Sequence, residues 1–302
     1  MRRASICIGF VVWLLSAAQA QQDAQISMYL RNPVQFNSAH AGTDGTLRVT
    51  AISRLQWVGW DGAPRTSFFS AHAPVLRDRM GIGVTMVTDK SGARGHNEFM
   101  AHAAYHLPEI KGIQWSAGLS LGFQNNHYDF SNLQVHHPGD LTQEMPYSET
   151  AFNAGFGVLG YKDGWYAGLS VPHLIEQSMG HQSTGPVQRR HWYLTGGKII
   201  PINQVINARF CGLLKRVSGA PMTLDINGEI WFYDLIALGA MCRFNEGFGF
   251  QGSYLFRDEW RFHYAVDFPL NGLMNGSFGS HEIGIAWDFG RKPLAYKSPR
   301  YF

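Results

Sequence analysis

The chain has 302 residues, a formal charge of +3 and only 16% charged side chains, together with 34 glycines and 14% aromatic residues. Its 25 basic and 22 acidic residues nearly balance, so charge gives no indication of nucleic-acid binding. Only Cys211 and Cys242 lie beyond the first twenty residues, which excludes a disulfide framework. Low charge with abundant glycine and aromatics is typical of a wall that faces lipid on one side.

Residues 1–20 have the pattern of a secretory signal peptide. Two arginines precede the apolar stretch 6–15, which is too short to span a membrane as a helix. Ala18-Gln19-Ala20 then matches a cleavage signal, so the mature chain is expected to begin at Gln21. No later segment reaches the roughly 20 apolar residues of a transmembrane helix. The remaining alternatives are a soluble secreted protein and an outer-membrane β-barrel.

Short segments with a period of two organise the chain beyond residue 45. In 115–123, large apolar residues alternate with serine and glycine, and 260–268 and 281–289 alternate in the same way. Successive side chains of a strand point to opposite faces, so each segment has one apolar and one small or polar face. The pattern predicts fourteen strands, at 46–56, 66–72, 81–88, 97–107, 114–124, 151–159, 165–171, 191–199, 207–215, 222–232, 235–244, 247–256, 260–268 and 281–289.

The lengths of the connections favour a barrel over a pair of soluble sandwiches. The odd-numbered connections hold up to 26 residues on these boundaries, whereas the even-numbered ones hold at most 8. Long outer loops and short periplasmic turns are typical of outer-membrane barrels. An even strand count also suits a closed antiparallel barrel, which leaves no backbone edge in hydrocarbon. The predicted fold is therefore an all-β, antiparallel transmembrane barrel.

Aromatic residues near the strand ends are candidates for interfacial girdles. The alternative is that they pack in a core as ordinary strand aromatics. They are Trp57, Trp165, Tyr166, Trp192, Trp231 and Trp260.

Residues with catalytic or metal-binding chemistry are scattered. His136 and His137 share a loop with Asp140 and Glu144, but adjacent histidines on a loop rarely make a tetrahedral zinc site, and a solvated loop is the preferred interpretation. Ser170 lacks the second glycine of a nucleophile elbow. The inward faces of the strands are expected to carry polar lumen residues, among them His102, His106, Asp225, Glu229 and Asp267. We expect no enzyme activity and no metal site.

The loop 57–65 combines two tryptophans with an Asp-Gly turn, a proline and an arginine. Asp-Gly and Ala-Pro favour turns, so a tight loop anchored by aromatics is one interpretation. A rigid docking surface is the other, because Trp and Arg dominate interface hot spots. The residue types alone leave both open.

Several further motifs follow one another along the chain. They are Gln25 to Tyr29 with Asn32-Pro33, Asn37 to Gly42, Gln56 to Thr66, Ser70 to Pro74, Gly81 to Val84, Asp89 to Gly92, Trp165 to Leu174, Gly279 to Ile283 and Ser298 to Phe302. In these motifs and in their order, the chain resembles the PorP/SprF family of type IX secretion outer-membrane proteins over nearly its whole mature length. His40 is a departure, because the family more often has tyrosine there.

The resemblance implies a barrel that supports export or surface attachment of proteins with a type IX C-terminal sorting domain, including gliding adhesins. Contacts with periplasmic or outer-membrane components of that machinery are also implied, in an outer-membrane location. No cofactor or catalytic residue carries over. The candidate docking residues lie in two of the matching motifs: Trp57, Trp60, Asp61, Pro64, Arg65 and His72.

These patterns divide the mature chain into an N-terminal segment, 21–45, a barrel, 46–289, and a tail, 290–302. The N-terminal segment is polar and aromatic without a strand pattern, and its density of motifs favours an ordered plug over a disordered periplasmic tail. The expected function is non-enzymatic support of type IX export or attachment. The alternatives are a fourteen-stranded channel for small or hydrophobic solutes and, far behind, an outer-membrane enzyme.

Overall fold

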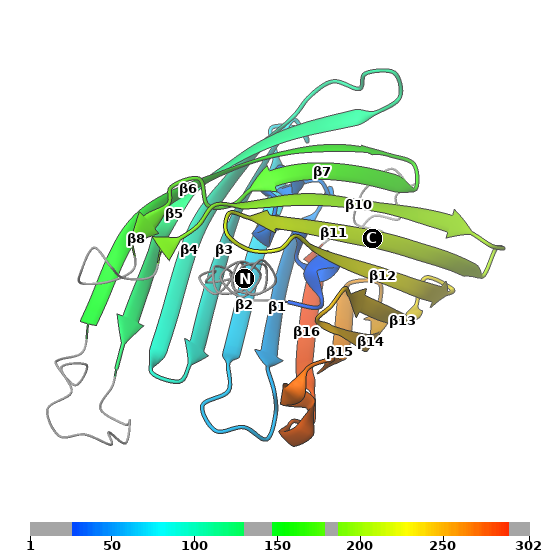
Figure 1. The fold of residues 1–302 in the computed structure, drawn as a ribbon. Coiled ribbons are helices and arrows are strands. Elements are labelled where there is room, and N and C mark those ends of the chain that lie inside the picture. Colours follow the sequence, from blue (N-terminus) through cyan, green and yellow to red (C-terminus); the bar gives the residue numbers. More distant parts are fainter. Residues whose placement is uncertain (1–25, 130–146, 179–186, 290–302) are drawn as a thin grey trace, which may run out of the picture.

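Fourteen antiparallel strands form a closed barrel in the computed structural model, which describes residues 26–129, 147–178 and 187–289 (Figure 1). Each strand pairs with its neighbour in the chain, and β1 closes the barrel by pairing with β16 from Leu47↔Phe289 to Leu55↔His281. Closure satisfies the backbone of every strand within the sheet, as hydrocarbon requires. In the described part of the chain, no helix is long and apolar enough to cross a membrane.

All fourteen predicted strands are confirmed, with ends that differ from the prediction by at most four residues. Their bounds are β1 Leu47–Leu55, β2 Arg65–Val75, β3 Met80–Ser91, β4 Arg94–His106, β5 Gln114–Tyr128, β6 Tyr147–Lys162, β7 Trp165–Val171, β10 His191–Pro201, β11 Ile206–Val217, β12 Thr223–Phe232, β13 Ile236–Arg243, β14 Gly247–Phe256, β15 Trp260–Pro269 and β16 Ser280–Phe289. A two-residue hairpin, β8 (Gln177–Ser178) with β9 (Val187–Gln188), was not predicted.

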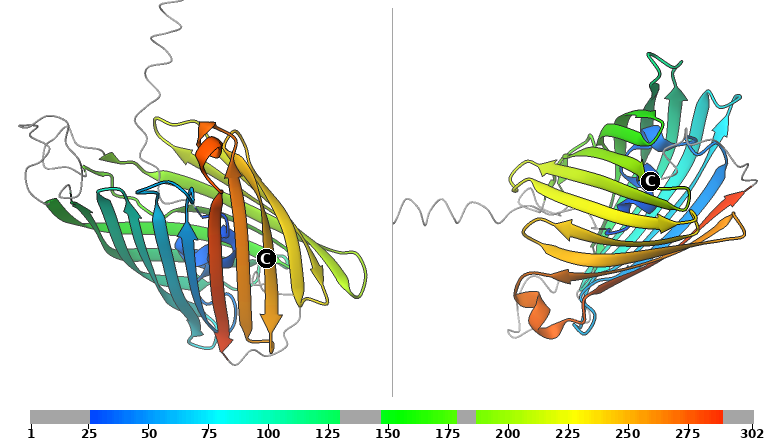
Figure 2. Two further views of the ribbon diagram at one scale, coloured as in Figure 1. Left: turned by 90° about the horizontal axis from the view of Figure 1, so that it is seen from below. Right: turned by 90° about the vertical axis from the view of Figure 1, so that its right-hand side faces the viewer.

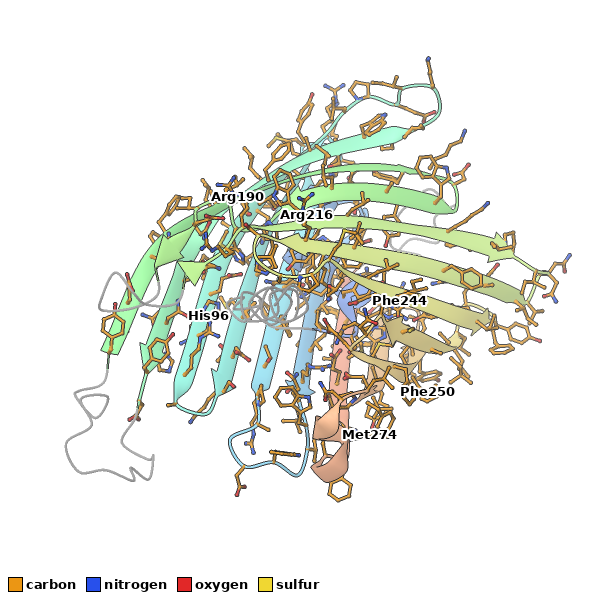
Figure 3. All side chains as sticks on the ribbon, in the orientation of Figure 1. His96, Arg190, Arg216, Phe244, Phe250 and Met274 are labelled. Atoms are coloured by element: carbon orange, nitrogen blue, oxygen red, sulfur yellow. The ribbon has the colours of Figure 1, made fainter. Side chains whose placement is uncertain are left out.

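The two faces of each strand differ as the period of two predicts. On β5, Leu119, Leu121 and Phe123 are more than half exposed, whereas Ser116 and Ser120 are buried. Figure 3 shows side chains on both faces of the wall, and Phe250 on β14 is among those that project outward. The exposed apolar face is the surface that lipid covers in an outer-membrane barrel.

The connections divide by length between the two ends of the barrel. Three of the seven at one end hold ten or more residues, and the longest holds 19. The six at the other end hold no more than 7. We call these the long-connection end and the short-connection end; the asymmetry matches outer and periplasmic sides of an outer-membrane barrel.

The lumen contains the chain that precedes β1. Residues 26–46 form three short 3-10 helices, η1 (Tyr29–Arg31), η2 (Pro33–Gln35) and η3 (Ser38–His40), which lie within the ring of strands (Figure 2). Nearly all of these residues are buried. The described part of the predicted N-terminal segment is therefore an ordered plug.

The predicted aromatic girdle needs two corrections. Trp231 and Tyr166 are buried against the plug rather than facing lipid, because their positions on β12 and β7 share the parity of the inward side chains. Trp192 and Trp260 do lie on the outer face, and Trp57 and Trp165 are half-buried.

A charge at the middle of the outer face should destabilise the barrel. Ile285 lies near the centre of β16 with its side chain outward. Ile285→Arg is expected to cost about 2–4 kcal/mol, whereas His281→Arg, on the same face near the strand end, should cost about 1 kcal/mol or less. Urea midpoints in lipid vesicles, read by heat-modifiable gel migration, measure the difference. Equal midpoints would contradict the outward register of β16.

Candidate functional site: the plugged lumen and the loop before Arg65

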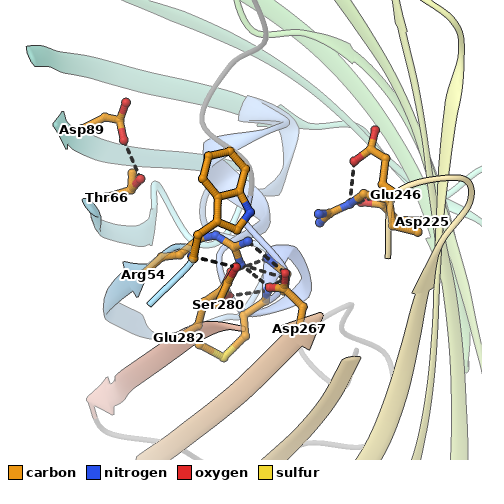
Figure 4. Close-up of polar contacts among 12 residues, drawn as sticks. Arg54, Thr66, Asp89, Asp225, Glu246, Asp267, Ser280 and Glu282 are labelled. Atoms are coloured by element: carbon orange, nitrogen blue, oxygen red, sulfur yellow. Dashed lines mark hydrogen bonds and ion pairs between the residues drawn. The ribbon is translucent and has the colours of Figure 1, made fainter. Parts of the chain in front are cut away.

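The first residues of the plug bind a buried charge cluster near the long-connection end (Figure 4). Arg54 on β1 contacts Asp267 on β15 at 2.6 Å and Glu282 on β16 at 2.5 Å. The backbone N–H groups of Ser27 and Met28 donate to the two carboxylate oxygens of Glu282, at 2.6 and 2.8 Å. One arginine and one glutamate thus join three strands to the plug. Charge-assisted bonds of this kind are about twice as strong as neutral ones.

A second cluster holds the middle of the plug. Arg31 in η1 forms an ion pair with Glu229 on β12. The indole N–H of Trp231 donates to the other carboxylate oxygen of Glu229 at 2.8 Å. The guanidinium of Arg209 lies 3.9 Å from the centroid of the Trp231 ring, in cation–π contact. Trp231 therefore orients the Glu229 carboxylate that binds Arg31 of the plug.

A third cluster anchors the end of the plug near the short-connection end. Arg48 on β1 contacts Asp44 at 2.9 Å and Asp288 at 2.6 Å. The backbone N–H of Gly42 donates to His72 Nδ1 at 3.2 Å, and the other ring nitrogen of His72 lies 3.4 Å from Asp44. The plug is thus tied to the wall at both of its ends and at its middle.

Between these clusters the plug backbone lies directly on β3 and β5. Ser116 donates to the carbonyl of Ala39 at 2.8 Å. A Cβ atom added at Gly118 would lie 2.4 Å from the nitrogen of Ala39, and one added at Gly81 would lie 1.8 Å from the carbonyl oxygen of Ala41. These two wall positions must be glycine for the plug to approach so closely.

A second segment covers part of the lumen from the long-connection end. His173, in the connection between β7 and β10, contacts Glu98 on β4 at 2.7 Å. In the same connection, Gln188 of the β8–β9 hairpin accepts a hydrogen bond from Gln124, and Ile175 bonds Asn153 through its backbone. The wall of β4 to β6 therefore holds the described residues of this connection inside the rim.

The loop between β1 and β2 has a defined conformation. Val58 exchanges two backbone hydrogen bonds with the connection between β15 and β16, to Gly279 at 2.9 Å and from Phe278 at 2.8 Å. The N–H of Gly92 donates to Gly62 at 3.0 Å, which ties the loop to the β3–β4 turn. With Lys90, the loop borders a hollow of about 320 Å³. It is therefore a braced part of the rim.

Five of the six predicted docking residues lie in or next to this loop. Trp57 is half-buried with a left-handed backbone, and Pro64 accepts the N–H of Gln56 through its carbonyl at 3.0 Å. Trp60 is 49% exposed, and Asp61 and Arg65 are also exposed. Their role in docking remains a prediction.

The sixth docking candidate, His72, lies elsewhere. It is seven residues along β2 from Arg65 and points into the lumen, where it holds Gly42 and Asp44 of the plug. An inward, buried imidazole is not available to a partner at the loop, so its place in that set is corrected.

The predicted inward residues are confirmed as lumen residues. Asp225 pairs with Lys215 and Arg243, and Glu229 and Asp267 pair with Arg31 and Arg54. His102 and His106 contact Ser38 and Ala41 of the plug. His136, His137, Asp140 and Glu144 lie outside the described residues. Among the residues that the structure describes, no cluster of His, Cys, Asp or Glu is arranged to hold a metal ion.

Sequence reasoning missed the residues that seat the plug, chiefly Arg31, Arg48, Arg54 and Glu282. For the three strand residues the inward parity was available, because Arg54 shares a face with Arg48 and Thr50, and Glu282 alternates with Ile283 and Ile285. Arg31 lies in the plug, where strand parity does not apply. A charged residue on an inward face signals a buried partner, but parity does not say on which strand the partner lies.

A closed ring of antiparallel strands with an apolar outer face is the architecture of an outer-membrane β-barrel. The family model "Type IX secretion system membrane protein PorP/SprF" matches residues 18–287. The chain belongs to this family, as the resemblance predicted.

Three solved structures are similar to this chain at low sequence identity. Acinetobacter baumannii Omp33 is 8% identical, with a TM-score of 0.48, over 81% of this chain and 98% of that one. A Pseudomonas aeruginosa FadL homologue is 8% identical, with a TM-score of 0.47, over 90% and 100%. The KdgM porin is 10% identical, with a TM-score of 0.39, over 80% and 99%. No curated protein matches the chain.

Removing the cation of the first cluster should loosen the plug. Arg54→Met leaves the carboxylates of Asp267 and Glu282 buried without their arginine, a cost of about 3–5 kcal/mol. The compensated variant Arg54→Met with Asp267→Asn and Glu282→Gln should recover a large part of this loss. Urea unfolding of the three proteins measures both effects. A single variant as stable as the parent would show that this cluster does not hold the plug.

Proposed function

We propose that this barrel is a non-enzymatic outer-membrane component of type IX secretion that docks a secreted sorting-domain protein, such as a gliding adhesin. Docking supports export of that protein or its attachment to the cell surface. The observation that carries the proposal is the filled lumen, beside a braced and exposed rim. Family membership supplies the type IX context.

The filled lumen argues against passage of a polypeptide through this barrel. Withdrawal of the plug would separate Glu282 from two backbone N–H groups, Glu229 from Arg31, and Arg48 from Asp44. Breaking one buried pair costs about 3–5 kcal/mol because it leaves an uncompensated charge. A partner therefore meets the two ends of the barrel and its outer face.

The rim at the long-connection end offers a surface for such a partner. Trp60 and Phe278 are 49% and 76% exposed, and Leu270 and Met274 in the same region are 62% and 50% exposed. We call these four residues the Trp60–Phe278 surface. The surface is formed by the β1–β2 loop and the β15–β16 connection. The two backbone hydrogen bonds of Val58 hold these segments together, so little conformational ordering is needed when a partner binds. The predicted location, in the outer membrane with this end outside, would present it to secreted proteins.

A channel is the alternative function, and the plug argues against it. The purified barrel in planar bilayers is expected to show no steady conductance. A variant that lacks residues 26–44, shown to be folded by heat-modifiable migration, is expected to conduct. A steady open conductance of the unmodified protein would favour the channel over the docking barrel.

The exposed tryptophan gives a direct test of docking. Trp60→Ala is expected to weaken binding of the sorting-domain partner by roughly thirtyfold, the effect of a hot spot of about 2 kcal/mol. The barrel should assemble normally, because the Trp60 side chain is half exposed. Trp192→Ala is the matched control, since Trp192 is 45% exposed on the outer face of β10. Partner protein on the cell surface and heat-modifiable migration are measured together. Unchanged partner display with Trp60→Ala would remove this surface from the mechanism.

A further inference from the structure

The outer face of β2 to β6 carries three parallel rows of side chains near the long-connection end. In each row, the residues are direct register partners on successive strands. The row furthest from the long-connection end is apolar: Phe69, Met86, Phe99, Phe123 and Phe152. Two residues further along each strand, the next row is neutral and polar: Ser67, Thr88, Asn97, Asn125 and Thr150. Beyond it lies a row with three basic residues: Arg65, Lys90, Gly95, His127 and Ser148.

The apolar row marks the boundary of the hydrocarbon. Aromatic residues of outer-membrane barrels gather at this level, and Phe99 and Phe123 are 42% and 57% exposed. Two residues of strand span about 7 Å, so the basic row lies about 13 Å along the strands from the apolar row. On strands tilted by about 40°, this is about 10 Å along the membrane normal. Because long basic side chains reach back toward the interface, the basic row acts at the level of lipid headgroups.

Arg65 and Lys90 are the distinctive pair in this arrangement. They are direct cross-strand partners on the outer face, and both are exposed. Like charges placed opposite each other destabilise a sheet unless something offsets them. In the described part of the chain, neither side chain forms an ion pair. Both border the hollow of about 320 Å³ under the β1–β2 loop, where Asp61 is the acid among its lining residues.

The polar row below them is also open to a ligand. Asn125 donates to Ser148 and Thr150, at 2.9 Å each, which fixes the β5–β6 side of the rows. The side chains of Ser67, Thr88 and Asn97 have no hydrogen-bond partner among the described residues. They offer hydroxyl and amide groups directly between the basic pair and the apolar row.

We propose that Arg65 and Lys90 bind the phosphate of a phosphorylated glycolipid in the outer leaflet. The acyl chains cover the apolar row, the sugar hydroxyls meet Ser67, Thr88 and Asn97, and a phosphate lies between the two cations. A multiply charged anion offsets the repulsion of the pair, and it outweighs the single charge of Asp61. The match of three chemistries in the order of a lipid favours a lipid over a protein partner or free phosphate.

The test counts lipid that stays bound to the purified full-length barrel. Native mass spectrometry is run in detergent after addition of diphosphoryl lipid A or of the same lipid without its phosphates. The unmodified barrel is expected to retain diphosphoryl lipid A at least about tenfold more strongly than the dephosphorylated form. Arg65→Gln with Lys90→Gln should remove this preference, since each charge-assisted contact contributes about that factor. Arg216→Gln is the matched control: Arg216 is exposed on the outer face at the same end, opposite Trp192.

Two further arms separate the lipid from other ligands. Excess inorganic phosphate should leave the retained lipid largely in place, because phosphate supplies no acyl or sugar contact. Thr88→Val with Asn97→Leu keeps both cations but removes part of the polar row, and it should lower retention of the dephosphorylated lipid as well. Equal retention by the unmodified and double-glutamine barrels would overturn the proposal. So would loss of lipid on addition of phosphate alone, or an equal effect of Arg216→Gln.

Discussion

Backbone N–H and C=O groups cannot stay unpaired in hydrocarbon, and this constraint determines most of the architecture. It closes the sheet through β1 and β16, and it forces each spanning strand to present one face to lipid. The other face is then enclosed, and here it carries arginine, aspartate, glutamate and histidine. Those charges need partners inside the barrel, because an unpaired buried charge is costly. The need to pair every backbone group thus encloses a lumen in which charged side chains also need partners.

The plug satisfies that second requirement through specific geometry. Glu282 receives Arg54 from the wall and two N–H groups from the plug, so neither component alone would satisfy it. Buried pairs of this kind add little net stability compared with an apolar core, but they are expensive to break singly. The plug is therefore held in one register, and the glycines at 81 and 118 leave room for its backbone to reach that register.

The sequence predicted the wall well because the wall follows a single local rule. A period of two specifies which residues share a face, and it located all fourteen strands. The same rule contains no information on what lies opposite an inward side chain. Tryptophan is typical of an interfacial girdle, but Trp231 occupies a strand position whose side chain points into the lumen. Its position, and not its residue type, therefore places it against Arg209. His72 appeared beside the loop in the sequence motifs, yet it holds the plug instead. Arg31 and Glu229 are 198 residues apart, a separation that no local pattern bridges.

The loop from Gln56 to Arg65 lies between the two binding surfaces proposed for this barrel, the Trp60–Phe278 surface and the Arg65–Lys90 pair. Trp60 faces the β15–β16 connection, where Gly276 leaves room for its indole ring. The last residue of the loop, Arg65, begins β2 on the lipid side, opposite Lys90. A protein partner at Trp60 and a lipid phosphate at Arg65 would therefore occupy different sides of one braced loop. Because the loop is already hydrogen-bonded to Gly279 and Gly92, both ligands could bind at once without a change in its conformation. Neither ligand would need a change in the lumen, which the plug keeps filled.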